Sequence, residues 1–206
     1  MTKVTGGRRR LYAAAMTPSE TAAPPGAESE VDIQQAMQDA ARASAYGNRW
    51  LMMLRSDAGK SVDRALVRCT GYSVVTWGFA KGGGHPYTPS LLLHTIGRKS
   101  GRIRSSVLPY FHVGSHLVVC GSKGGGPLDP LWAENIRSDE NCWIHIRRQL
   151  VPVTGREVVG EERVQLYPVV AAMHPGLDAY TERAGQYGRD IPLILLKPRA
   201  PLPKGA

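Results

Sequence analysis

From residue 90 onward the chain is organised as short apolar runs separated by glycine, proline and polar residues, which is the pattern of β-strands joined by turns. The predicted strands are residues 90–96, 103–113, 116–121, 142–147, 150–159 and 191–197. Several of these runs are separated only by turns short enough for hairpins. Short connections favour antiparallel pairing, so the expected fold class is α+β, a small antiparallel barrel interrupted by short helices rather than a doubly wound sheet.

The region before these strands has a different pattern. Residues 1–30 show no periodicity and are expected to form a disordered leader. Residues 31–87 are expected to form an N-terminal helical extension, which includes a short helix from Ser61, as its N-cap, to about Val67. The glycines and prolines of "GFAKGGGHPYTP" (78–89) are expected to end helical structure there.

Two further helices are predicted between the strands. Asp129 is expected to cap a short helix over residues 130–136, with Pro130 at its first position. A helix over residues 160–173 begins with acidic side chains, which the helix dipole favours. No apolar run in the sequence is as long as a membrane span.

Charge adds a second kind of information. The chain carries a formal net charge of +9, and residues 64–128 contain no Asp or Glu but eight Lys or Arg. The densest part is "HTIGRKSGRIRSSVLPYF" (94–111), which holds Arg98, Lys99, Arg102 and Arg104 at the tip of a predicted strand pair. An exposed patch of positive charge and an anionic partner are therefore expected. Charge alone leaves nucleic acid, a membrane surface touched peripherally and a phosphorylated small molecule open.

Cysteine and histidine usage narrows the classes of site. Cys69, Cys120 and Cys142 form an odd set without CxxC spacing, which fits a reducing cytoplasm and small hydrophobic roles for all three. The histidines show no metal-ligand spacing with a carboxylate or cysteine, so no metal site is expected. No motif for nucleophilic catalysis is present either.

Two glycine-rich cationic loops, "GRKSGR" (97–102) and "GSKGGG" (121–126), are candidate anion sites, because glycine lets backbone N–H groups converge while Lys and Arg add charge. The alternative is a solvated hairpin tip. In "DPLWAENI" (129–136), Trp132 and Asn135 share one helical face and are candidates for lining a planar heterocycle. The alternative for Trp132 is a role in the core.

Four segments taken together, "LLLHTIGRKSGRIR", "VVCGSKGGGPLDPLWAENI", "GEERVQLYPVVAAMHPGLDAY" and "RDIPLILLKP", resemble the deazaflavin-dependent nitroreductase family of actinobacteria. The resemblance covers residues 88–198, the expected core domain, and leaves residues 199–206 as a tail. It implies a split β-barrel related to flavin-mononucleotide-binding oxidoreductases. It also implies reduced coenzyme F420 as cofactor and hydride transfer to an electron-poor acceptor such as a quinone, an enone or a nitroaromatic compound.

The resemblance further implies a set of cofactor-binding positions. The coenzyme is a flat ring attached to a phosphate and a tail of glutamates, so cations would hold the tail and a glycine-rich wall would lie against the ring. In chain order the implied positions are Arg98, Lys99, Arg104, Ser122, Lys123, Gly124, Trp132 and Asn135.

The acceptor side departs from the family. Where nitroimidazole-activating members have three tyrosines, "HPGLDAY" keeps Tyr180 and has His174 and Leu177 at the other two positions. Tyr180 and His174 are the catalytic candidates, as donors of the proton that follows hydride addition. Glu134 stands beside Asn135, where the family usually has an uncharged residue.

The leading hypothesis is therefore a cytoplasmic F420H2-dependent reductase, monomeric or homodimeric, that acts on a small-molecule electron acceptor. The first alternative is the same barrel with flavin mononucleotide (FMN) as cofactor. The second is a non-catalytic basic binding module, either a cofactor carrier or a nucleic-acid-binding module. Nucleic acid is not the expected partner, because no aromatic-studded strand for base stacking is present.

Overall fold

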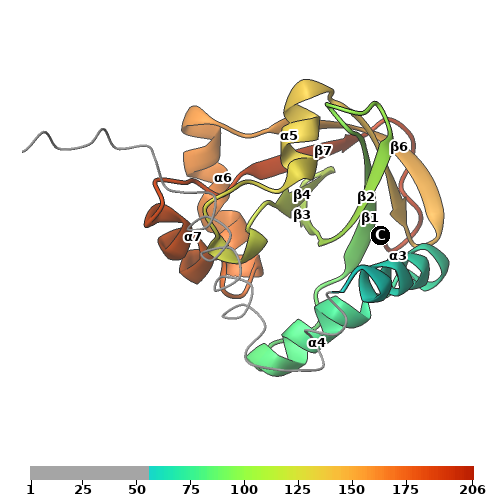
Figure 1. Cartoon of the computed structure of the whole chain (residues 1–206), viewed down its shortest axis with the longest axis horizontal. Coiled ribbons are helices and arrows are strands. Elements are labelled where there is room, and N and C mark those ends of the chain that lie inside the picture. Colours follow the sequence, from blue (N-terminus) through green and yellow to red (C-terminus); the bar gives the residue numbers. More distant parts are fainter. Residues whose placement is uncertain (1–55) are drawn as a thin grey trace, which may run out of the picture.

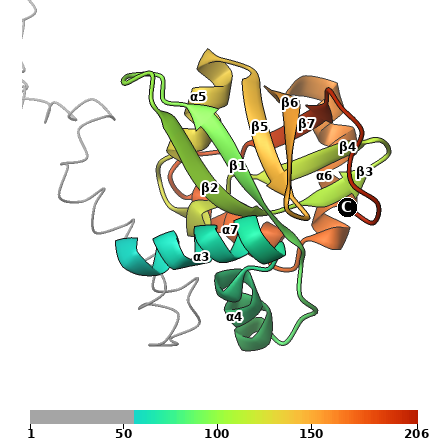
Figure 2. The ribbon, with the colours of Figure 1, turned by 90° about the vertical axis from the view of Figure 1, so that its right-hand side faces the viewer.

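The computed structural model describes residues 56–206. The expectations for the leader, residues 1–30, and for residues 31–55 of the helical extension lie outside the described residues. The described part contains one antiparallel sheet of seven strands in the order β2-β1-β5-β6-β7-β4-β3 (Figures 1 and 2). The strands are β1 Ser90–Ile96, β2 Ile103–Pro109, β3 Phe111–Val113, β4 His116–Cys120, β5 Asn141–Ile146, β6 Gln149–Glu157 and β7 Leu193–Pro198.

The sheet curls until its two edges meet. β2 lies at one edge and β3 at the other, yet only Tyr110 separates them along the chain. One residue spans about 3.5 Å, so the two edges must approach each other at this point. Contacts between β2 and β4 agree with this closure. The predicted α+β class and antiparallel split barrel are confirmed.

The predicted strand over residues 103–113 is wrong in one respect, because it is two strands. Pro109 has no N–H group to continue the ladder of β2, and the chain leaves the first edge there. After Tyr110, β3 pairs with β4, with Phe111 opposite Val118. The predicted hairpin with the 116–121 run is therefore made by β3 alone.

The described helices are α3 Asp57–Thr70, α4 Val74–Gly83, α5 Leu131–Ser138, α6 Gly160–Met173 and α7 Leu177–Gly185, with a 3₁₀ turn η1 at Lys123–Gly125. The prediction for α6 is confirmed at both ends. The N-cap of α3 is Ser56, whose hydroxyl accepts a hydrogen bond from the Gly59 N–H at 3.2 Å, so the prediction of Ser61 as the cap is wrong. Asp129 does not cap α5 either, because its carboxylate binds two arginines.

The helix α4 extends over the first glycines of the segment 78–89 and ends within it, at Gly83, so the segment does end helical structure as expected. The start of α4 is held by Asp63 of α3, which is 4% exposed. The Asp63 carboxylate accepts hydrogen bonds from the Ser73 hydroxyl at 2.9 Å and from the Val74 N–H at 2.9 Å. Its C-cap is Gly84, whose φ of 67° suits glycine. A buried tertiary cap thus offsets the weak helix propensity of the segment.

The apolar side chains form two clusters. The larger one fills the barrel, with Leu91, Ile144 and Leu196 among its fully buried members. The second lies between β4, β7 and the helices α6 and α7. Cys142 and Cys120 are buried in these clusters, whereas Cys69 is exposed, so the prediction of an apolar environment holds for two of the three cysteines.

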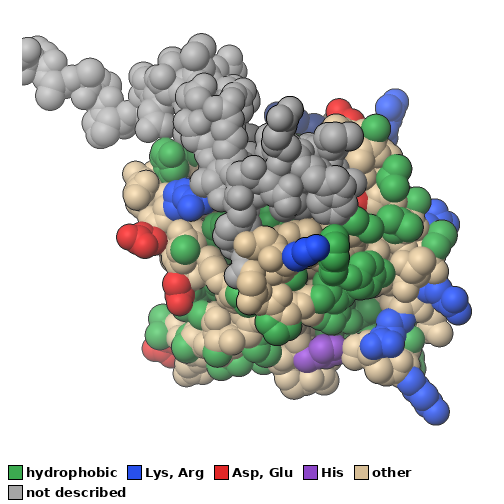
Figure 3. All heavy atoms as spheres, turned by 90° about the horizontal axis from the view of Figure 1, so that it is seen from below, with side chains coloured by type: hydrophobic (Ala, Val, Ile, Leu, Met, Phe, Trp, Pro, Cys, Tyr) green, Lys and Arg blue, Asp and Glu red, His purple; other side chains and the backbone are tan. Residues whose placement is uncertain are grey.

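The face on which α4 lies is seen from below in Figure 3, where apolar side chains gather between Lys and Arg side chains. Exposed large apolar residues of the α3–α4 region include Val62, Tyr72 and Trp77. Within residues 56–206 no helix is both long and apolar enough to cross a membrane. Peripheral membrane contact stays a prediction.

Candidate functional site

A cavity of about 520 Å³ lies along the free edge of β2. One side is formed by α3 and α4 and the other by η1, α5 and the segment around α7. Consecutive strand residues point to opposite faces, so Ser105 and Ser106 reach the cavity from the two faces of β2. The volume falls within the range of roughly 300–1,000 Å³ that is usual for small-molecule sites.

Most of the predicted ring-side residues line this one cavity. They come from the loop after β4, from α5 and from the segment that precedes and includes α7. These residues are Ser122, Lys123, Gly124, Trp132, His174 and Tyr180. Trp132 is 7% exposed and belongs to the barrel core, and it also lines the cavity. Its contact with a planar heterocycle stays a prediction. Local motifs far apart in the sequence thus converge on one space.

The loop over residues 121–126 has a backbone that needs glycine. Lys123, Gly124 and Gly125 have φ values of 45°, 71° and 77°, so three successive residues are left-handed. A Cβ on Gly125 would lie 2.8 Å from the Tyr180 carbonyl oxygen and 2.9 Å from Cβ of Arg183. Arg183 also donates a hydrogen bond to the Gly124 carbonyl at 2.7 Å. The glycines therefore let the loop pack directly onto α7.

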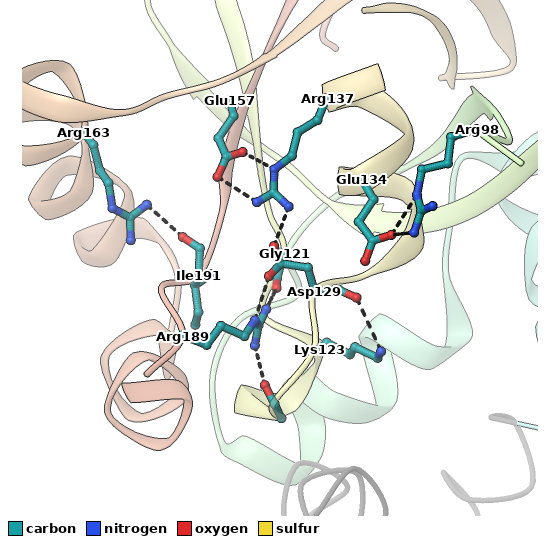
Figure 4. A network of polar contacts seen from close by, with 11 residues as sticks. Arg98, Gly121, Lys123, Asp129, Glu134, Arg137, Glu157, Arg163, Arg189 and Ile191 are labelled. Carbon is teal, nitrogen blue, oxygen red and sulfur yellow. Dashed lines mark hydrogen bonds and ion pairs between the residues drawn. The ribbon is translucent and has the colours of Figure 1, made fainter. Parts of the chain in front are cut away.

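Arg189 holds the same loop from the other side, as Figure 4 shows. Its guanidinium donates to the carbonyl oxygens of Gly126 at 2.7 Å and Ser122 at 3.2 Å, and also to that of Gly121. It forms an ion pair with Asp129 at 2.7 Å. Burial raises the pKa of the Asp129 carboxyl, but hydrogen bonds from the arginines, that of Arg189 foremost, outweigh burial and lower it.

Arg189 was not singled out from the sequence, although it stands in "RDIPLILLKP". It is 9% exposed, and such burial of an arginine marks a structural or functional role. Nothing local to position 189 indicates its partners, which lie more than sixty residues away in the chain. A contact of that range requires the fold.

Lys123 carries positive charge into the cavity wall. Its Nζ lies 3.5 Å from the Asp129 carbonyl oxygen, and none of the ion pairs among the described residues involves it. Burial lowers the pKa of the Lys123 ammonium, and the nearby charge of Arg189 lowers it further. The Lys123 side chain is nevertheless exposed, and the carboxylates of Glu134 and Asp129 raise the same pKa, so its positive charge is available to a negatively charged ligand.

The cationic β1–β2 turn lies beside α5, outside the cavity lining. Arg98 forms an ion pair with Glu134 (Figure 4). The Arg98 backbone N–H donates a hydrogen bond to Asn135 Oδ1 at 3.1 Å. Lys99 and Arg104 are exposed. Glu134 also acts electrostatically on Lys123, so this carboxylate stands between the two predicted cationic loops.

Asn135 is 5% exposed and takes a different place from Trp132. Its amide donates to the Thr95 hydroxyl at 3.0 Å while accepting from the Arg98 backbone. Both ends of the amide are thus used to fix the β1–β2 turn to α5. The side chain holds the cationic turn in place, and its predicted direct contact with the cofactor remains a prediction.

His174 faces the cavity next to two aromatic rings. Its ring centroid lies 5.2 Å from that of Phe111 and 6.2 Å from that of Tyr180. Nδ1 lies 3.0 Å from the Pro175 carbonyl oxygen, which can only accept, so Nδ1 carries the proton. Burial lowers the pKa of His174, which favours the neutral ring with a lone pair on Nε2.

A second polar group lies on the α3 side of the cavity and was missed from the sequence. His94 Nδ1 is 2.8 Å from the Ser105 hydroxyl, and His94 Nε2 is 2.7 Å from His145 Nδ1. The three residues come from β1, β2 and β5. The pattern of alternation places each of them on a strand face, but only the register brings them together.

Comparison with known proteins bears on the function of this arrangement. Residues 72–198 match the family described as F420H(2)-dependent quinone reductase. The chain belongs to that family. The resemblance found in the sequence is confirmed, and the family match also includes α4.

Members of the F420H(2)-dependent quinone reductase family occur in Mycobacterium tuberculosis. One F420H(2)-dependent quinone reductase from strain H37Rv is 30% identical over 113 residues, which is 54% of this chain and 74% of the relative. A putative F420H(2)-dependent quinone reductase from the same strain is 30% identical over 114 residues and is covered to 91%. Among solved structures, an F420-H2 dependent reductase is 27% identical, with 53% of this chain and 94% of that chain covered and a TM-score of 0.47.

Proposed function

We propose that this protein is an F420H2-dependent reductase whose acceptor is a quinone. The observation that carries the proposal is the convergence of Ser122, Lys123, Gly124, Trp132, His174 and Tyr180 on one cavity. Family membership supplies the class of cofactor. The reduced deazaflavin supplies the hydride, and the protein supplies binding, orientation and charge.

The residues fit such a cofactor. The cavity is large enough for a flat ring, and Trp132 gives it an apolar wall. Lys123 lies in that wall without an ion-pair partner among the described residues, so its exposed positive charge is available to an anionic or electron-rich group. We assign the phosphate and glutamate tail to Arg98, Lys99 and Arg104 on the adjacent turn, where the charges are exposed to a flexible polyanion.

The protein side of the mechanism is electrostatic. The positive charge of Lys123 and the dipoles of the left-handed loop would stabilise negative charge that develops at the site during hydride transfer. Tyr180 and His174 stay the predicted donors of the following proton. Neutral His174 with Nδ1 bonded to Pro175 offers a lone pair, so His174 suits orientation of a hydroxyl group better than donation.

The test of binding is a titration of the purified protein with the oxidised and reduced deazaflavin at low salt, followed by fluorescence. Micromolar affinity that weakens with salt is expected, since the tail is polyanionic. Lys99→Glu should weaken this affinity far more than it lowers the melting temperature, while Lys204→Glu, an exposed lysine near the C-terminal end, should change neither strongly. Absence of binding, or tighter binding of FMN, would exclude the F420 assignment.

The test of turnover is an acceptor panel that contains the naphthoquinone menadione, a cyclic enone and a nitroaromatic compound. Oxidation of the cofactor with menadione, faster than with the other two, is expected for a quinone reductase. Cofactor binding without turnover on any acceptor would instead identify a carrier. The cytoplasmic location and the monomeric or homodimeric state remain predictions from the sequence.

A further inference from the structure

Three polar side chains form a continuous chain across the outer face of the sheet. The Ser105 hydroxyl is 2.8 Å from His94 Nδ1, and His94 Nε2 is 2.7 Å from His145 Nδ1. Both distances are those of short hydrogen bonds. Ser105 lines the cavity, whereas His145 is half-buried at the other end of the chain. The chain therefore joins the cavity to a position near the protein surface.

The strand register explains why these side chains meet. His94 is directly opposite Ser105 in the β1–β2 pair, so the two lie on the same face of the sheet. His145 is opposite Leu92 in the β1–β5 pair, which places it diagonally next to His94 on the same face. The helix α3 packs over β1, β2 and β5 and covers this face. The arrangement is fixed by backbone pairing rather than by flexible loops.

We propose that Ser105, His94 and His145 form a proton relay that brings a proton from solvent into the cavity for reduction of the quinone. The proposal rests on the proposed function. Reduction of a quinone to a hydroquinone adds one hydride and one proton. The hydride comes from the reduced deazaflavin, which is oxidised, and the relay accounts for the proton.

The proton balance follows the hydrogen bonds. The Ser105 O–H bond breaks as its proton passes to the quinone oxygen, and His94 Nδ1–H donates to the Ser105 oxygen. His94 Nε2 takes a proton from His145 Nδ1, and His145 Nε2 takes one from a solvent water, which leaves a hydroxide ion in the bulk solvent. Each imidazole gains one proton and loses one, so neither ring needs to stay charged.

The surroundings of the pair favour neutral rings. Burial lowers the pKa of His94 to about 4, and the positive charges that His145 and Arg68 can carry lower it further. Burial also lowers the pKa of His145, with Arg68 of α3 as the second cause. Two neutral imidazoles that share one hydrogen bond must adopt the same tautomer, either both protonated on Nδ1 or both on Nε2. These are the two states between which a relay alternates.

Two other candidate donors, Tyr180 and His174, line the same cavity, and the geometry of His174 favours the relay over donation by that ring. His174 Nδ1 is committed to the Pro175 carbonyl oxygen, so the proton on this nitrogen is not free to pass to a substrate. The Ser105 hydroxyl lines the cavity and is connected by hydrogen bonds to two imidazoles that can exchange protons. His94 and His145 act through Ser105 and are positioning residues for that group.

The first experiment needs no cofactor. Nitrogen-15 NMR of histidine-labelled protein, with His94→Gln and His145→Asn for assignment, reports the protonation of each ring nitrogen. Both rings are expected to be neutral near pH 7 and in matching tautomers, and Ser105→Ala should shift both toward protonation on Nε2. Opposite tautomers, or a charged His94 at that pH, would overturn the relay.

The second experiment measures turnover with menadione in water and in deuterium oxide. His145→Asn should lower kcat about 100-fold, within the range usual for loss of acid–base assistance. It should also flatten the pH profile and leave cofactor affinity within about two-fold of wild type, because His145 lies outside the cavity lining. Added imidazole should restore part of the rate. His112→Asn, an exposed histidine on β3, is the matched control and should behave as wild type.

The outcomes separate the relay from the proposed function. A wild-type protein that neither binds nor oxidises the reduced deazaflavin would overturn the proposed function. The NMR experiment would still show whether His94 and His145 share one tautomer. An active wild type with unchanged kcat, pH profile and solvent isotope effect in His145→Asn would overturn the relay alone. If His145→Asn fails to fold, as judged by its melting curve, Ser105→Ala provides the same kinetic test from the cavity end.

Discussion

Arg189 and Asp129 form an ion pair, with Arg189 Nε 2.7 Å from Asp129 Oδ1, beside the loop that lines the cavity. The arginine side chain is 7% exposed, and its remaining donors bind backbone carbonyls of that loop. The pair joins the segment before β7 to the segment before α5. The shape of the cavity wall therefore depends on a residue that does not line the cavity.

Replacement of this arginine tests that dependence. Arg189→Gln is expected to lower the free energy of unfolding by about 3–5 kcal/mol, because it removes one partner of a buried pair and leaves loop carbonyls without donors. Denaturant unfolding measures the loss. Arg148→Gln, an exposed arginine in the β5–β6 turn, is the control. Equal stability of the two variants would contradict the structural role of Arg189.

The glycine at position 125 offers a matched comparison. Gly125→Ala places a Cβ 2.8 Å from the Tyr180 carbonyl oxygen at a φ of 77°, whereas Gly101→Ala, at a φ of 63°, meets nothing within 4 Å. Both variants pay the strain of a left-handed alanine, about 1–2 kcal/mol. Only Gly125→Ala must also displace α7 or the loop, so it is expected to be less stable than Gly101→Ala by about 1 kcal/mol. Thermal unfolding of both variants, with cofactor titration, checks the difference.

The sheet shows where prediction from the sequence reaches its limit. Short apolar runs bounded by turn residues located the residues of every strand, because the need to bury a strand is visible locally. The break at Tyr110 was missed, since Pro109 allows both a strand end and an edge strand. Strand order was not accessible either, because β1 pairs with β5 across more than forty intervening residues.

In the candidate site, too, some residues could be predicted from a local sequence pattern and others could not. Ser122, Lys123, Gly124 and Trp132 are adjacent or nearly so in the sequence, and their types alone indicate an anion-binding loop next to an aromatic wall. Arg189 and the His94–His145 pair depend on register and on packing between distant segments. Such contacts leave no local pattern. The cap that Asp63 provides for α4 is a further example, and it helps the helix to continue over the first glycines of that segment before it ends at Gly83.

The Arg98–Glu134 ion pair predicts a gain of affinity on mutation. Glu134→Gln removes a carboxylate that competes with an anionic tail for Arg98 and adds negative potential near Lys123. Because both side chains are partly exposed, the pair is worth about 0.2–1 kcal/mol, which corresponds to cofactor affinity higher by up to about five-fold. Fluorescence titration at low salt measures the effect.

The control for this prediction is Glu140→Gln, an exposed carboxylate that is not in an ion pair among the described residues. It changes the net charge by the same amount. A similar gain in both variants would mean that only net charge matters. Weaker binding in Glu134→Gln would instead show that this carboxylate orients Arg98 for the cofactor.

The hydrogen bonds of Asn135 are expected to contribute to the free energy of unfolding. Asn135→Ala leaves the buried Thr95 hydroxyl and the Arg98 backbone N–H without their partner, which costs about 1–3 kcal/mol. Thr95→Val removes one of the same hydrogen bonds and should not add fully to Asn135→Ala in the double variant. Denaturant unfolding of the three variants measures the coupling. Full additivity would contradict the shared hydrogen bond.

The histidine pair predicts how stability depends on pH. Burial lowers the pKa of His94 to about 4, whereas the unfolded chain keeps the usual value of about 6.5. Between these two values the unfolded state binds more protons than the folded state, so the free energy of unfolding falls as the pH drops from 6.5 toward 4. His94→Gln removes this linkage. The variant should be less stable than wild type at pH 7.5, because it loses the hydrogen bonds to Ser105 and His145, and the difference should narrow by pH 5. Melting temperatures of wild type, His94→Gln and His112→Asn at the two pH values measure the change. A constant difference between wild type and His94→Gln would show that His94 protonates as readily in the folded chain as in the unfolded one.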